Sequence, residues 1–79
     1  MAIDYYANAR RIIECLKAAG RKVDADSLIE VMAAGSTATE ILMGLRWHLK
    51  RIDADGQPAD LDCKQQIRTL ISQLDKVLS

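Results

Sequence analysis

The sequence predicts an all-α fold, a small antiparallel bundle of four helices, three long and one short, within a single domain covering residues 1–79. Apolar residues make up 49% of the chain but Phe is absent, a composition that favours helices over sheets. Apolar side chains recur at spacings of three and four, and capping residues, Gly and Pro separate the periodic segments. Amphipathic helices with short connections bury their apolar faces against each other, which gives a bundle.

The first helix is expected from about Asp4 to Ala19. Its inward stripe consists of Tyr5, Ala9, Ile12, Leu16 and Ala19. Gly20 follows as a residue able to adopt a positive φ, and Lys17 lies near the negative end of the helix dipole. These signals predict that the helix stops at Gly20.

The second helix is expected to be short, from about Ala25 to Ala34. Asp24 is its predicted N-cap, and Val23 is placed to pack against Leu28 as a hydrophobic staple. Gly35 is expected to end it.

The third helix has the clearest signals. Thr37 and Glu40 have the spacing of a capping box, in which each side chain satisfies the other residue's backbone N–H. The inward stripe consists of Ala38, Leu42, Leu45, Leu49 and Ile52.

A turn is expected over residues 53–59, because Gly56 and Pro58 cannot both continue a helix. The fourth helix then runs from about Leu61 to Leu78, with Asp60 as its cap. Its stripe consists of Cys63, Ile67, Leu70, Leu74 and Val77.

The only tryptophan, Trp47, does not belong to the stripe of the third helix. At about 100° per residue it lies about 160° from the centre of that stripe. Met43 shares its face, and Gly44 lies beside it at a helix-interior position where glycine is unfavourable unless another segment approaches closely. The cations flanking this face are Arg46, Lys50 and Arg51.

Two explanations remain open for Trp47. It is covered by the second helix, the chain ends or a second copy, because large aromatics are usually buried. Alternatively, Met43 and Trp47 form an anchor for a protein partner, because Trp and Arg are enriched at binding hot spots. His48 is expected to be a partly buried packing residue, since no nucleophile or carboxylate has an evident relation to it.

The acidic segment around Asp53 and Asp55 offers a second contact surface, for a basic partner. It matches part of a calcium-binding loop, but Arg51 occupies the first ligand position and Pro58 the eighth. We therefore expect no metal and no cofactor.

The overall charge limits the classes of partner. Eleven basic and eleven acidic side chains cancel, which argues against binding to nucleic acid or to an anionic membrane.

Cys15 and Cys63 lack metal-ligand spacing and are expected to be buried free thiols. No signal peptide or membrane span is evident, so a cytoplasmic location is expected.

The function expected from these features is a non-enzymatic protein-binding module, such as a small inhibitor of the immunity or antitoxin type, with a homodimer left open. The expected contact residues are Met43, Arg46, Trp47, Lys50, Arg51, Asp53 and Asp55. The alternative is a dimeric helix-turn-helix regulator, because residues 27–41 place Gly35 at the turn between two helices. Glu40 and the neutral net charge oppose DNA binding.

Overall fold

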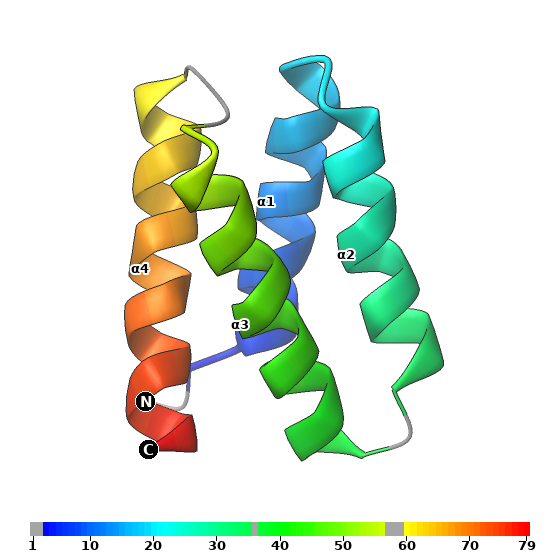
Figure 1. Cartoon of the computed structure of the whole chain (residues 1–79), viewed down its shortest axis with the longest axis vertical. Coiled ribbons are helices and arrows are strands. Elements are labelled where there is room, and N and C mark those ends of the chain that lie inside the picture. The colour runs from blue at the N-terminus through cyan, green and yellow to red at the C-terminus, as the bar shows by residue number, and fades with distance from the viewer. Residues whose placement is uncertain (1–2, 36, 57–59) are drawn as a thin grey trace.

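The computed structural model describes residues 3–35, 37–56 and 60–79. These residues form α1 (Tyr5–Ala18), α2 (Lys22–Ala34), α3 (Ala38–Ala54) and α4 (Leu61–Leu78). Successive helices run in opposite directions, and each packs beside the next (Figure 1). Since α4 also packs against α1, the four helices enclose a common core. The prediction of an all-α antiparallel bundle is confirmed.

The core draws apolar side chains from all four helices, as the three-four periodicity predicts. Its buried members are Ala9, Ile12, Ile13, Leu16, Ala25, Leu28, Leu45, Leu49, Ile52, Cys63, Ile67, Leu70 and Leu74. The predicted stripes fail at helix ends, where Ala19, Ala38 and Val77 are exposed. An end residue keeps the phase of the stripe but has no neighbouring helix beyond it to pack against.

Side-chain caps begin three of the helices. The backbone N–H three residues further on donates to each capping oxygen: Ala7 to Asp4 at 2.9 Å, Glu40 to Thr37 at 3.1 Å and Cys63 to Asp60 at 3.1 Å. The predicted caps at Thr37 and Asp60 are confirmed, and Asp4 precedes α1 as its cap. Such caps satisfy backbone donors that have no partner within the helix.

The turn between α1 and α2 is a Schellman motif. Gly20 has a φ of +78°, and its N–H donates to the Lys17 carbonyl at 3.1 Å. The next N–H, of Arg21, reaches back to the Leu16 carbonyl at 2.8 Å. Because glycine adopts positive φ without steric cost, this turn is tight and α2 begins at once.

The predictions for the start of α2 are wrong. The helix begins at Lys22 rather than Ala25, and Asp24 lies in its first turn, where it accepts from the Arg21 Nε at 3.0 Å instead of capping the helix. Val23 is 79% exposed, so it forms no staple. With 13 residues α2 is longer than predicted, although it is still the shortest of the four helices. The tight turn at Gly20 leaves no room for the expected loop.

The expected acidic turn also begins later than predicted. Asp53 and Ala54 form the end of α3, and Asp55 is its C-cap residue. Pro58 lies outside the described residues.

The two cysteines are not free thiols. Cys15 of α1 and Cys63 of α4 form a disulfide, with their Cα atoms 5.9 Å apart. The sequence does not predict this disulfide, because the two residues are 48 positions apart and only the packing of α1 against α4 brings them together. The disulfide joins the end of α1 to the first turn of α4.

Candidate functional site

The outward face of α3 carries two large exposed apolar side chains. Trp47 is 57% exposed and Met43 is 56% exposed, whereas Leu45 and Leu49 on the same helix are fully buried. The helical phase predicted for Trp47 is therefore confirmed. The explanation that the protomer's own helices cover the indole is wrong for the described chain.

Gly44 explains how α3 sits against α2. A Cβ atom placed on Gly44 would lie 2.7 Å from Cγ1 of Val31 on α2. Such a distance is too short for two carbon atoms in contact. Glycine therefore allows the close approach of the two helices on the flank of α3 next to Trp47.

Two side chains on the α2 side of α3 hold the indole in place. The guanidinium carbon of Arg51 lies 5.4 Å from the centre of the Trp47 ring, within the range of a cation–π interaction. The His48 ring meets the indole edge-to-face, with ring centres 4.8 Å apart and an interplanar angle of 86°. His48 is half-buried, in agreement with its expected role as a packing residue.

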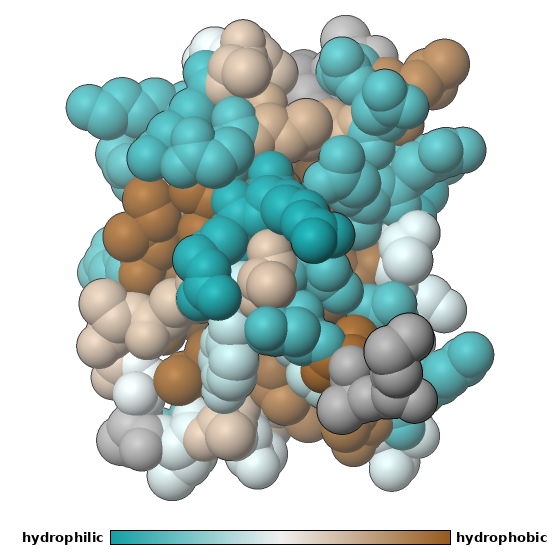
Figure 2. Space-filling view, turned by 180° about the vertical axis from the view of Figure 1, so that it is seen from behind, coloured by the Kyte–Doolittle hydropathy of each residue, from teal (hydrophilic) through white to brown (hydrophobic). Residues whose placement is uncertain are grey.

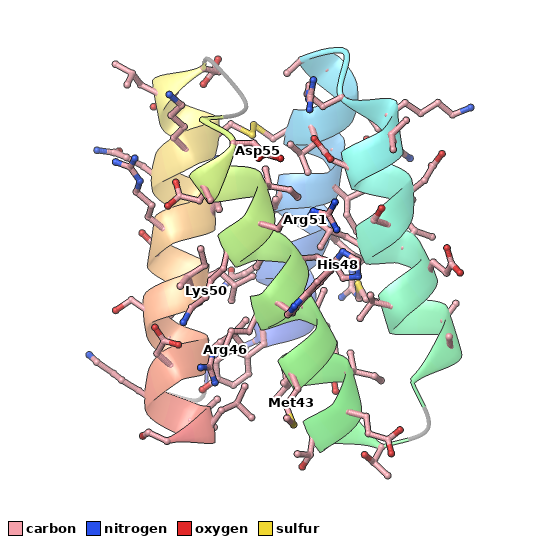
Figure 3. The ribbon with its side chains drawn as sticks, in the orientation of Figure 1. Met43, Arg46, His48, Lys50, Arg51 and Asp55 are labelled. Carbon is pink, nitrogen blue, oxygen red and sulfur yellow. A yellow bond between two sulfur atoms is a disulfide. The ribbon has the colours of Figure 1, made fainter. Side chains whose placement is uncertain are left out.

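Arg46 and Lys50 turn toward α4, whereas Arg51 and His48 lie on the side of α2 (Figure 3). Both cations contact the same carboxylate oxygen of Asp75 on α4. Arg46 Nε lies 2.9 Å from Oδ1 of Asp75, and Lys50 Nζ lies 3.1 Å from the same atom. That oxygen is buried and neither contact has hydrogen-bond geometry, so the interaction is an ion pair. The sequence alone does not single out Asp75, because only the antiparallel pairing of α3 with α4 places it at this face.

The outward face of α3 has a shallow concavity of about 390 Å³. Five side chains line it: Met43, Arg46, Trp47, Lys50 and Arg51. We refer to these five residues as the Trp47 surface. The three cations exceed the one adjacent carboxylate of Asp75, so the concavity and its rim carry a charge of plus two. The structure thus groups five of the seven residues that the sequence singles out.

The other two residues, Asp53 and Asp55, do not line the concavity. Asp53 accepts from the Arg68 Nε at 3.0 Å, an interaction within the chain that reduces what it offers to a basic partner. Asp55 is exposed at the far end of α3 from Met43 (Figure 3), about 18 Å along the helix axis at the usual rise per residue. Asp53 and Asp55 therefore border the concavity, one turn beyond Lys50 and Arg51, without lining it.

Further hollows lie between α1 and its neighbours. The groove between α1 and α4 is lined by polar groups, where the Asn8 amide donates to Gln73 at 3.3 Å. The groove between α1 and α2 contains Ile29 and Met32 and no aromatic residue. From behind, Figure 2 shows hydrophilic side chains over the middle of the molecule with hydrophobic patches beside them. Neither groove combines an aromatic anchor with adjacent cations.

No protein-family model, curated protein or solved structure matches this chain. Within residues 3–35, 37–56 and 60–79, no three His, Cys, Asp or Glu side chains are grouped as metal ligands. Over the same described residues, none of the helices combines the length and apolar character needed to cross a bilayer.

Proposed function

We propose that this chain is a non-enzymatic protein-binding module that uses the Trp47 surface to bind and modulate a protein partner, in the manner of small inhibitor, immunity or antitoxin proteins. The observation that carries the proposal is the exposure of Trp47 and Met43 at 57% and 56% on the outward face of α3. Exposed large apolar residues ringed by polar groups mark interaction sites more often than isolated ones do.

The composition of the Trp47 surface supports a protein partner. Trp and Arg are the residue types most enriched at hot spots, and Met adapts to irregular partner shapes. The indole is already oriented by Arg51 and His48, which lowers the conformational entropy lost on binding. A partner that covered Trp47 and Met43 would bury apolar area at the centre and leave the cations at the rim.

Charge complementarity favours an acidic partner surface. The excess of two positive charges around the concavity attracts carboxylates and disfavours a basic partner. We expect the partner to place an apolar or aromatic side chain against Trp47 and carboxylates against Arg51 and Lys50. Such an interaction weakens as the salt concentration rises, because the charges lie at the exposed rim.

The helix-turn-helix alternative gains less support. In that motif the second helix crosses the first at a steep angle, so that it can enter the major groove. Here α2 and α3 lie side by side in opposite directions (Figure 1), and Gly44 allows their close packing. A homodimer through the Trp47 surface remains an outcome that the following experiment distinguishes.

The experiment compares capture by the immobilised wild-type chain and by two variants in lysate of the native host. Trp47→Ala combined with Met43→Ala removes the anchor, and Val23→Ala is the matched control because Val23 is 79% exposed on a different helix. We expect at least one acidic protein that the wild type and the Val23 variant retain and the double variant loses. A retained protein that is this chain itself indicates a homodimer.

Circular dichroism checks that both variants keep the helical content of the wild type, since exposed positions tolerate substitution. Equal retention of every captured protein by the wild type and the double variant would remove the basis of the proposal. The cytoplasmic location stays a prediction that fractionation of host cells tests, and the Cys15–Cys63 disulfide counts against it, because a reducing cytosol keeps thiols reduced.

A further inference from the structure

The disulfide between Cys15 and Cys63 is asymmetric. Cys63 is 0% exposed within the core, whereas Cys15 is only half-buried at the edge of α1. Cys15 also lines a shallow depression on the surface between α1 and α4, and Cys63 does not. A small molecule in that depression therefore meets Cys15 before it meets Cys63.

The depression has a basic character. Arg10 and Arg11 line it together with a single carboxylate, Glu14, which lies 3.7 Å from the Lys17 ammonium. The two guanidinium groups are thus opposed by one carboxylate that is already paired. A ligand with negative charge is favoured there over one with positive charge.

We propose that Cys15 is a thiol-exchange site that accepts small anionic thiols and disulfides, with Cys63 as its buried partner. This site is independent of the Trp47 surface and of the proposed function. The chemical class is a low-molecular-weight thiol that carries carboxylates, of which glutathione is the probe used below.

The exchange proceeds in two balanced steps. In the first, the thiolate of one small thiol attacks the sulfur of Cys15, the bond between the two protein sulfurs breaks, and Cys63 leaves as a thiolate that takes up a proton. In the second, another small thiolate attacks the small-molecule sulfur of the mixed disulfide and releases Cys15 as a thiol. Two small thiols are thereby oxidised to one small disulfide, and the protein disulfide is reduced to two thiols.

Two single-cysteine variants test the assignment of Cys15. Cys63→Ser leaves Cys15 as the only thiol, and Cys15→Ser leaves Cys63. Each is incubated with glutathione disulfide, and mass spectrometry follows the rate at which glutathione is attached. We expect attachment to Cys15 at least tenfold faster than attachment to Cys63 in the folded chain, and equal rates in concentrated urea, where burial is lost.

The charge preference is measured with the Cys63→Ser variant. Glutathione disulfide is anionic and cystamine is cationic, so the ratio of their rates reports the local charge. We expect this ratio to be higher in the folded chain than in urea. The combined substitutions Arg10→Gln and Arg11→Gln should return it to the urea value, whereas Lys76→Gln on an exposed part of α4 should leave it unchanged.

A third measurement uses the wild-type chain and does not depend on the folding of the variants. The air-oxidised protein is partly reduced with glutathione, quenched with acid and mapped by peptide mass. We expect the mixed disulfide on Cys15. Glutathione found mainly on Cys63, equal folded-state rates for the two single-cysteine variants, or an oxidised protein that contains no disulfide would each overturn the proposal.

Discussion

Gly44 of α3 faces Val31 of α2 so closely that an added Cβ would lie 2.7 Å from the valine Cγ1. Glycine inside an exposed helix normally costs about 1 kcal/mol relative to alanine. Here that cost is offset by the packing of two helices, and the same packing fixes which side of α3 faces solvent. The exposure of Trp47 is thus linked to a contact on the adjoining flank of its helix, because residues three apart in a helix lie about 60° from each other.

Gly44→Ala should therefore fail to stabilise the protein. The gain in helix propensity of about 1 kcal/mol is outweighed by overpacking, which costs about 1–3 kcal/mol, so we expect a net loss of about 1 kcal/mol in the free energy of unfolding. In the background of Val31→Ala the same substitution should become stabilising. Urea denaturation of the four proteins in a double-mutant cycle measures this coupling, and purely additive effects would show that the close approach is absent.

Reduction of the disulfide should lower the stability considerably. The disulfide closes a loop of 48 residues between α1 and α4. By restricting the unfolded chain, a disulfide across such a loop raises the free energy of unfolding by about 4 kcal/mol. This is a large share of the stability of a small domain. The measurement is the urea midpoint with and without a strong reductant, and the Cys15→Ser/Cys63→Ser variant, which should not respond to the reductant, is the control.

Asp75→Asn should affect binding more than folding. The carboxylate pairs with Arg46 and Lys50, but all three side chains are 37–46% exposed, and exposed pairs contribute about 0–1 kcal/mol. Removal of the carboxylate raises the charge of the Trp47 surface and should strengthen capture of an acidic partner at low salt. Asp26→Asn, an equal change in net charge on an exposed part of α2, is the control and should have a smaller effect.

Fluorescence quenching tests the Trp47 surface without a partner. Trp47 is the only tryptophan, so the emission reports one site. Because cations surround an exposed indole, iodide should quench it efficiently and caesium should quench it less, with the difference reduced at high salt. Resistance to both ions would show that the indole is covered in solution.

The sequence predicts the fold well where a local rule is sufficient. The stripes that contain Leu16, Leu49 and Ile67 and the caps at Thr37 and Asp60 depend on residues within one or two turns of each other, and the structure confirms them. The outward direction of Trp47 follows from the same periodicity.

The failures depend on contacts between distant residues or on a turn tighter than expected. The pairing of Cys15 with Cys63 and the ion pairs of Asp75 depend on which helices are neighbours, which periodicity does not specify. The early start of α2 follows from the Schellman turn at Gly20, which ends α1 and lets the next helix begin three residues later without a side-chain cap.

The most direct test of the proposed function is the equilibrium affinity between the purified chain and the partner that it captures, measured by titration calorimetry. Truncation of a hot-spot side chain costs at least about 2 kcal/mol, so Trp47→Ala should raise the dissociation constant by roughly 30-fold. Val23→Ala should leave it unchanged. Equal dissociation constants for the wild type and Trp47→Ala would contradict the account, because the partner would then bind elsewhere on the bundle.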